Sequence, residues 1–392
     1  MDSLSAFGQV VISPNGVHRL RQNHLWIYST DVEKEPRNRS SPIVQVIDRA
    51  RNHLGYAFYS KRSQIRLRLL SRGSEAPTPE WIHERVKVSV QRRTALLQAG
   101  SACRLIFGEA DLLPSIVADL YGRHVVLQTL SSGADAIKPI LIESLRDLLA
   151  PEGIYERNDV KARRLEGLDE IQGSLWGKTP SEVEIKEAGL RFYVDIPGGQ
   201  KTGFFLDQRE NRIAAGKYAF GRGLDCFTNT GAFALHFSQR CKSVLAIDAS
   251  ASSIAQGMRN AAMNGITNVD FKEANVFDFL RERERAGENF DIICLDPPAF
   301  AKGRGALSAA RAGYKEINLR AMKILRPEGI LVTSSCSYQL SEQAFFELIC
   351  EASRDARRFV QVVEHRGQSS DHPILVGMPE THYLKCFILR VT

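Results

Sequence analysis

The chain has 392 residues, of which 43% are hydrophobic and 25% charged. This composition is typical of globular proteins, and the length favours two or three domains. No window approaches the roughly 18 uninterrupted apolar residues of a membrane-spanning helix. The first residues also lack a secretory signal, so we expect a cytoplasmic protein without a membrane partner.

The net charge of +7 is unevenly distributed along the chain. Residues 1–73 hold 12 Lys and Arg against 5 Asp and Glu, whereas the remaining residues balance at 40 and 40. A basic module attached to a neutral body suggests a part that binds a polyanion such as nucleic acid. A merely soluble, arginine-rich surface is the plainer alternative.

The first 73 residues are predicted to form short strands and turns, with strands at 10–12, 43–47, 54–59 and 64–70. Pro14, Asn15 and Gly16 indicate a turn. The last strand alternates arginine with apolar residues, which places Arg66 and Arg68 on one basic face that we expect to hold RNA phosphates. Residues 74–79 contain two prolines and indicate a linker.

Residues 78–188 are predicted to form a small α/β unit, with helices at 81–99 and 136–149 and strands at 115–119, 124–130 and 153–157. Pro139 is tolerable because it falls in the first turn of its helix. From residue 190, apolar runs at 223–227, 243–248, 290–296 and 329–333 alternate with helix-length segments. This pattern predicts a parallel, doubly wound sheet, which binds ligands beyond the carboxyl ends of its strands.

Two of these strand ends carry weak signals for a nucleotide site. Phe227, Thr228 and Gly231 follow the first strand in a turn that enters a helix, and a plain strand-to-helix turn would look the same. Asp248 ends the second strand, where an acid can accept both ribose hydroxyls of an adenosine ligand. A helix cap is the other reading of Asp248, and both can hold at once.

The other two strand ends carry an acid and a thiol. Asp296 is followed by Pro297 and Pro298, which fix the backbone, and Cys336 follows the last strand. A thiolate that adds to carbon 6 of cytosine makes carbon 5 nucleophilic, and an acid at ring N3 stabilises the developing charge. A buried structural cysteine is the plainer reading.

Metal and phosphate sites have little support. The seven cysteines are scattered and form no C-x-x-C pair, and the nine histidines include no H-E-x-x-H motif, so we expect no metal. Residues 198–202 hint at a phosphate loop, but Gln200 stands where such a loop requires glycine.

The chain resembles the RlmI-type 5-methylcytosine methyltransferases of large-subunit ribosomal RNA. The resemblance covers nearly the whole chain. It is carried by several motifs in one order, at residues 24–28, 63–66, 108–114, 155–160, 201–209 (KTGFFLDQR), 296–298 (DPP), 311–318 (RAGYKEIN) and 335–337 (SCS).

The resemblance implies an α/β fold in three domains and a homodimer. A β-rich PUA-like RNA-binding domain at 1–73 precedes a small central α/β domain at 78–188. A Rossmann-like class I domain that depends on S-adenosylmethionine follows at 190–392.

The resemblance also assigns the site. It places the cofactor against Thr202, Gln208, Arg209, Phe227, Thr228, Gly231, Asp248, Asn275, Val276 and Asp296. Within this set Asp248 meets the ribose, and Asn275 and Val276 meet the adenine. Cys336 falls on the family's nucleophile and Asp296 on its acid.

Three departures from the family pattern stand out. Asn275 replaces the usual Asp, Ala232 a frequent Gly, and Asn229 a more usual Ser or Tyr. Many 5-methylcytosine RNA enzymes also carry a second cysteine after the acid motif, where this chain has Ala299 and Phe300. The group that assists product release is therefore unassigned.

Two rival functions stay open at this point. One is a methyltransferase of the same fold acting on guanine N7 or an exocyclic amine, which needs no thiol. The other is a non-catalytic RNA-binding assembly factor. Tyr314 and Lys315 are expected substrate contacts, with plain helix surface as the alternative.

Overall fold

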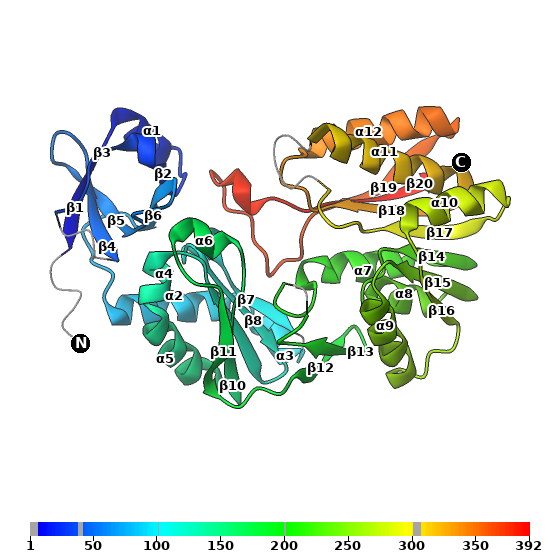
Figure 1. Cartoon of the computed structure of the whole chain (residues 1–392), viewed down its shortest axis with the longest axis horizontal. Helices are drawn as coiled ribbons and strands as arrows, with labels where there is room; N and C mark the ends of the chain where they lie inside the picture. Colours follow the sequence, from blue (N-terminus) through cyan, green and yellow to red (C-terminus); the bar gives the residue numbers. More distant parts are fainter. Residues whose placement is uncertain (1–6, 38–41, 101, 200, 301–306) are drawn as a thin grey trace. The chain divides into compact units, whose positions relative to one another are not determined.

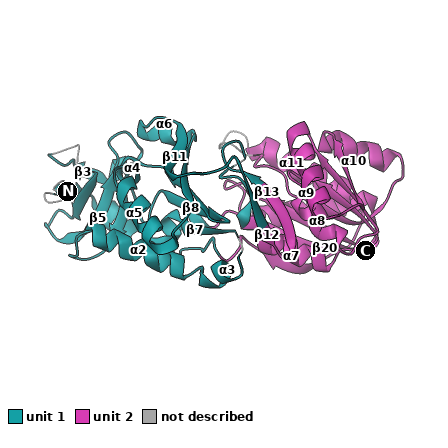
Figure 2. Ribbon diagram, turned by 90° about the horizontal axis from the view of Figure 1, so that it is seen from below, with its two compact units in different colours: residues 1–185, 194–206, 371–381 teal, residues 186–193, 207–370, 382–392 magenta. Residues whose placement is uncertain are grey.

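The computed structural model describes residues 7–37, 42–100, 102–199, 201–300 and 307–392. The chain forms two compact units, coloured separately in Figure 2. The first comprises residues 1–185, 194–206 and 371–381, and the second comprises residues 186–193, 207–370 and 382–392. Gln200 lies outside the described residues.

The first unit opens with a six-stranded sheet in the order β2-β6-β5-β4-β1-β3. Its strands are β1 (Gly8–Ile12), β2 (Trp26–Tyr28), β3 (Val32–Lys34), β4 (Ile43–Ile47), β5 (His53–Tyr59) and β6 (Ile65–Ser71). All four strands predicted here are present. The pair β1–β4 is parallel and the other pairs are antiparallel.

The turn predicted at Pro14 is wrong, because helix α1 (Pro14–Arg21) begins there. Ser13 caps this helix by accepting a hydrogen bond from the backbone N–H of Gly16 at 3.2 Å. Proline fits the first helical position, where its missing N–H costs nothing. Gly16 packs against Ile12 and Asp31, where a Cβ would meet atoms at 3.3 to 3.4 Å.

A second sheet of the first unit has the order β11-β10-β9-β8-β7. Its strands are β7 (Cys103–Phe107), β8 (Ile116–Tyr121), β9 (His124–Thr129), β10 (Gly153–Asn158) and β11 (Ile171–Gly177). Its helices are α2 (Pro79–Gln91), α3 (Thr94–Gln98), α4 (Ser132–Ala136), α5 (Lys138–Leu149) and α6 (Ala162–Glu166). Pro139 lies in the first turn of α5, as predicted.

The single helix predicted at 81–99 is two helices, α2 and α3. The break falls at Arg93, whose buried guanidinium donates to both carboxylate oxygens of Asp111 at 2.7 Å. It also donates to the carbonyl of Arg104 at 3.0 Å. These tertiary bonds outweigh the local helical preference.

The two sheets of the first unit share a hydrophobic core. Ile43, Tyr56 and Phe58 of the first sheet pack in one cluster with Leu105 and Ile116 of the second. A hairpin of β12 (Glu182–Glu187) and β13 (Leu190–Asp195) follows. Residues 186–193 of this hairpin cluster with the second unit.

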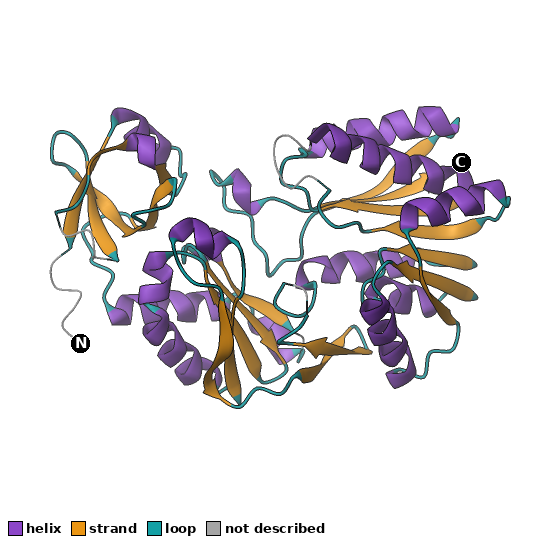
Figure 3. Cartoon of the chain, viewed as in Figure 1, coloured by secondary structure: helices purple, strands orange, loops and turns teal. Residues whose placement is uncertain are grey.

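The second unit is built on a seven-stranded sheet in the order β16-β15-β14-β17-β18-β20-β19 (Figures 1 and 3). Its strands are β14 (Arg222–Cys226), β15 (Ser243–Asp248), β16 (Val269–Glu273), β17 (Phe290–Leu295), β18 (Leu325–Ser335), β19 (Val360–Arg366) and β20 (Lys385–Val391). The first five of these are parallel, and β20 is antiparallel to both β18 and β19. The four predicted strands are present, whereas β16, β19 and β20 were not predicted.

Helices cover both faces of this sheet, as predicted. They are α7 (Arg209–Lys217), α8 (Ala232–Ser238), α9 (Ala251–Met263), α10 (Val276–Arg285), α11 (Leu307–Ile324) and α12 (Glu342–Ala356). One core cluster joins the sheet to α10, α11 and α12, and another joins it to α7 and α8. The buried parallel strands therefore present their carboxyl ends at one edge, between the two helical layers.

Candidate functional site

Asp296 and Cys336 directly follow two neighbouring strands at the carboxyl edge of the sheet. Strands β17 and β18 pair in parallel, with Leu295 opposite Thr333, so the residues that follow them leave the sheet side by side. The Cys336 thiol lies 3.9 Å from the carbonyl oxygen of Pro297, the residue after Asp296. Cys336 is partly exposed. This edge therefore carries an acid and a partly exposed thiol at the ends of two adjacent strands.

A chain of polar side chains orients the Asp296 carboxylate. Gln208 donates from Nε2 to Asp296 Oδ1 at 2.8 Å, and Asn211 Nδ2 donates to Gln208 Oε1 at 2.7 Å. Arg366 Nε donates in turn to Asn211 Oδ1 at 3.0 Å. Each amide thereby has its orientation fixed by the next partner. Gln208 and Arg209, at the start of α7, are both buried.

The loop after β14 is held in an unusual backbone conformation. Phe227, Asn229 and Gly231 have φ angles of +63°, +48° and +82°. Thr228 Oγ1 and the N–H of Ala234 both donate to Asp225 Oδ2, at 2.5 and 2.9 Å. The backbone here is bent back on itself at the strand end, a shape that lets main chain approach a ligand closely.

Asp225 is the buried anchor of that loop. Its side chain is almost inaccessible to solvent. Burial raises the pKa of its carboxyl to about 7, although its hydrogen bonds with Thr228 and Ala234 oppose the shift. The sequence reasoning passed over Asp225, which precedes Cys226 inside a run read as a plain buried strand.

Asp248 joins the same loop to the end of β15. Its Oδ2 accepts the N–H of Asn229 and its Oδ1 accepts the N–H of Ser250, each at 2.9 Å. The cap of α9 is Ser250, not Asp248, so the helix-cap reading of Asp248 is wrong. A carboxylate has about four acceptor positions, so two remain for the hydroxyls of a ligand.

Asn275 and Val276 open helix α10. Asn275 is its N-cap, and its side-chain oxygen accepts from the N–H groups of Phe277 and Asp278 at 3.0 and 3.3 Å. The side chain of Val276 is 3% exposed and belongs to the core. The Val276 side chain is therefore not presented to a ligand, while Asn275 keeps its amide donors.

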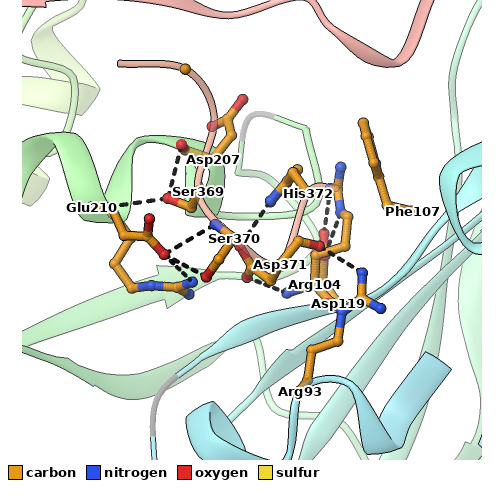
Figure 4. A network of polar contacts seen from close by, with 12 residues as sticks. Arg93, Arg104, Phe107, Asp119, Asp207, Glu210, Ser369, Ser370, Asp371 and His372 are labelled. Atoms are coloured by element: carbon orange, nitrogen blue, oxygen red, sulfur yellow. Dashed lines mark hydrogen bonds and ion pairs between the residues drawn. The ribbon is translucent and has the colours of Figure 1, made fainter. Parts of the chain in front are cut away.

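Thr202 belongs to the first unit, whereas the other expected cofactor residues belong to the second. Its hydroxyl is buried, donates to Asp119 and lies 2.9 Å from the hydroxyl of Tyr121. Arg104 binds the same Asp119 carboxylate through two hydrogen bonds of 2.8 Å (Figure 4). Thr202 is thus part of a buried polar cluster around Asp119.

Arg66 and Arg68 do not form the exposed basic face that was expected. Arg68 is buried and forms an ion pair of 2.9 Å with Glu166 of α6. Arg66 donates to the carbonyl of Ser60 at 3.0 Å and lies 3.4 Å from the carboxylate of Glu35. The expectation fails because Arg68 is engaged by Glu166 of α6 and Arg66 by groups of its own sheet's segment.

Tyr314 is likewise buried rather than an exposed substrate contact. Its hydroxyl lies 2.9 Å from Ser337 Oγ, and its ring lies 4.7 Å from that of Phe300. Lys315 next to it pairs with Asp355 at 2.9 Å and with Glu351 at 3.4 Å on α12. Tyr314 contacts Ser337, the residue after Cys336, and Lys315 links α11 to α12.

Lys385 is a functional candidate that the sequence reasoning missed. It begins β20, lies opposite Ser335 in the β18–β20 ladder and is 3% exposed. Its ammonium donates to the carbonyl oxygens of Ser337 at 2.8 Å and Tyr383 at 2.9 Å. A lone lysine inside the apolar run 384–389 was the available signal.

No helix of the described residues combines the length and apolar character needed to cross a membrane. Among the same residues, no three His, Cys, Asp or Glu side chains gather in a way that would hold a metal ion.

The chain is similar in sequence to known protein families and to curated proteins. Residues 10–72 match the family model of a PUA-like domain, and residues 160–379 match that of an S-adenosylmethionine-dependent methyltransferase. A curated protein of Tolumonas auensis, called ribosomal RNA large subunit methyltransferase I, is 40% identical and covers 95% of this chain and 96% of its own length. A protein of the same name from Klebsiella pneumoniae is 36% identical over 99% of both chains.

Solved structures show the same fold. A chain from Streptococcus mutans described as a SAM-dependent methyltransferase has a TM-score of 0.82 at 21% identity, covering 98% of this chain and 100% of that chain. A methyltransferase solved with SAH has a TM-score of 0.85 at 21% identity, with the same coverage. The expected fold class, a PUA-like module before a Rossmann-like sheet, is confirmed.

Proposed function

We propose that this chain methylates carbon 5 of a cytosine in large-subunit ribosomal RNA. The chain belongs to the family of S-adenosylmethionine-dependent methyltransferases that includes ribosomal RNA large subunit methyltransferase I. The observation that carries the choice of carbon 5 is the pairing of Cys336 with Asp296. A methyltransferase acting on an amine needs the acid but not the thiol.

The residues of the second unit suit the methyl donor. S-adenosylmethionine supplies an electrophilic methyl group on a positively charged sulfur. Asp248 keeps acceptor positions for the ribose hydroxyls, and the bent backbone at Phe227 and Gly231 lies at the adjacent strand end. Asn275 offers amide donors at the start of α10. This acceptor and donor set fits a nucleoside at a sheet switch point.

The protein's own groups would act on the cytosine in sequence. The Cys336 thiolate forms a bond to carbon 6, and the ring electrons move toward N3, where protonated Asp296 delivers a hydrogen bond or proton. Carbon 5 then takes the methyl group, leaving the donor sulfur as a neutral thioether, and loses its own proton to a base. The carbon 6–sulfur bond breaks to return the thiolate, and N3 gives its proton back to the Asp296 carboxylate. Gln208 holds Asp296 in place throughout.

The target base must leave its stack to reach this edge. RNA phosphates would be held by the exposed basic residues of the first sheet's module, such as Arg21, Arg51 and Lys61, since Arg66 and Arg68 are already engaged. With a ribosomal RNA substrate the protein would act in the cytoplasm, and the family resemblance implies that it would do so as a homodimer.

Covalent trapping tests the proposal. Enzyme, S-adenosylmethionine and ribosomal RNA containing 5-fluorocytidine are incubated, and a denaturation-resistant adduct is sought. Fluorine cannot leave as a proton does, so the adduct should accumulate, vanish in Cys336→Ala and persist in Cys350→Ala, which removes an exposed cysteine on α12.

Two other results would contradict the proposal and favour a rival function. Methyl transfer to ordinary RNA without any adduct would favour guanine N7 or an exocyclic amine. No calorimetric affinity for S-adenosylmethionine would favour a non-catalytic RNA-binding factor.

A further inference from the structure

Lys385 is a buried cation whose surroundings supply little negative charge. Its ammonium has three donors, and two of them reach the carbonyl oxygens of Ser337 and Tyr383. These bonds fix the ammonium against the segment Ser335–Ser337, because Ser335 is its partner in the β ladder and Ser337 its acceptor. Cys336 lies between those two residues.

The ionisable groups around Lys385 are few. Cys336 and Glu342 are the two that interact with its charge. Glu342, at the start of α12, is 38% exposed and lies 3.1 Å from His365 and 3.9 Å from His382. Glu342 is therefore shared with two imidazoles and screened by water, which leaves the partly buried Cys336 thiol as the other ionisable group that interacts with the ammonium.

We propose that Lys385 is the positioning residue that keeps Cys336 as a thiolate, by holding an ammonium beside the sulfur at the end of β18. The inference rests on the proposed function, because a thiolate is required for addition to carbon 6 of a pyrimidine. The thiol gives its proton to solvent, and the resulting thiolate and ammonium form an ion pair. Lys385 begins β20 and Cys336 follows β18, and the antiparallel pairing of these two strands fixes their relative positions.

The electrostatics of the neighbouring groups agree with this arrangement. Burial lowers the pKa of Lys385 to about 8, and Cys336 and Glu342 oppose that shift. A thiolate partner therefore favours the charged lysine, and by reciprocity the ammonium favours the thiolate. Burial raises the pKa of Tyr314, whose hydroxyl faces Ser337, so this phenol stays neutral. Asp296 on β17 is the remaining acid near the thiol and would oppose ionisation when charged.

The pH dependence of alkylation tests the proposal without RNA or methyl donor. Full-length protein is treated with iodoacetamide from pH 5 to 10, and chymotryptic peptides are quantified by mass spectrometry. Tyr338, Phe345 and Phe346 separate Cys336 from Cys350, so the exposed Cys350 is an internal reference. In the wild type, the midpoint for Cys336 should lie below that for Cys350.

Two variants sharpen the test. Lys385→Met keeps an unbranched side chain one atom shorter and removes the charge, so the Cys336 midpoint should rise by about one pH unit, with alkylation near pH 7 about tenfold slower. Lys385→Arg should hold the midpoint near the wild-type value. Cys350 should titrate alike in all three proteins.

Either of two results would overturn the role of Lys385: a wild-type Cys336 midpoint at or above that of Cys350, or an unshifted midpoint in folded Lys385→Met. If Lys385→Met does not fold, the wild-type comparison and Lys385→Arg decide. Failure of the trapping experiment with a low Cys336 midpoint would reject the cytosine reaction and keep the ion pair.

Discussion

The side-chain amide of Gln208 donates to the carboxylate of Asp296 at 2.8 Å, and its own oxygen is held by Asn211 at 2.7 Å. Because Asn211 occupies that oxygen, the amide cannot turn over without breaking both bonds. Asp296 therefore receives a donor of fixed direction. The orientation of the proposed acid depends on a residue that belongs to a different element, at the start of α7.

Replacing Gln208 should slow the reaction more than it weakens donor binding. Gln208→Leu removes a hydrogen bond to the protonated Asp296 carboxyl of the proposed mechanism, which contributes about 0.5–1.5 kcal/mol, so kcat should fall about 2- to 12-fold. Single-turnover kinetics and calorimetry with S-adenosylmethionine separate the two effects. Gln343→Leu, on the exposed face of α12, is the matched control. A large rise in donor Kd with unchanged kcat would instead make Gln208 a cofactor contact.

Asp225 should make the stability of the protein fall with rising pH. Its pKa is raised from 3.8 to about 7, so between about pH 4 and 7 the folded chain retains a proton that the unfolded chain has lost. The cost of charging this buried group is absent below that window and fully present above it. Asp225→Asn does not titrate, so its Tm relative to the wild type should increase from pH 5 to pH 8. Parallel Tm profiles for the two proteins would contradict this account.

Replacing Arg68 should lower the free energy of unfolding and leave RNA binding unchanged. Arg68→Met leaves the buried Glu166 carboxylate without its partner, which costs about 3–5 kcal/mol, and adding Glu166→Gln should restore much of the loss. Urea unfolding measures both. The salt dependence of RNA binding should keep its slope, whereas losing a phosphate ligand would reduce the slope by about one. Arg49→Met, which removes an exposed arginine paired with Glu33, should leave stability nearly unchanged.

The sequence was sufficient to predict the parallel core of the second unit and that Asp296 and Cys336 follow neighbouring strands of it. Both residues directly follow buried strands, and parallel strands bring such positions to one edge. Lys385 could not be placed in the same way. It arrives on an antiparallel strand from a distant part of the chain, and an apolar run does not reveal which neighbour it will pair with.

The errors at Arg68 and Tyr314 have a related cause. Alternation places Arg66 and Arg68 on one face of a strand, but it does not tell whether that face meets water or a helix such as α6. Helical spacing in the same way leaves open which side of α11 Tyr314 occupies. Tertiary packing decides both, and in each case a polar group was buried with a specific partner: Glu166 for Arg68 and Ser337 for Tyr314.

The segment 371–381 returns to the first unit after residues 207–370 of the second unit, and the chain then re-enters the second unit at residue 382. There the carbonyl of Asp371 accepts from Arg93 at 2.8 Å and its carboxylate from the N–H of Arg104 at 2.9 Å (Figure 4). Farther along, the buried Met378 packs in the core of the first sheet, and its sulfur accepts from the N–H of Leu25 at 3.1 Å.

Residues 1–206 therefore do not make up the complete first unit, because the unit also needs residues 371–381. A fragment that stops at residue 206 would expose the groove left by Met378 and strip Arg93 of an acceptor. Exchanging the first unit between relatives would require transferring two stretches of gene together, so recombination that moves only the first stretch should yield insoluble or unfolded hybrids.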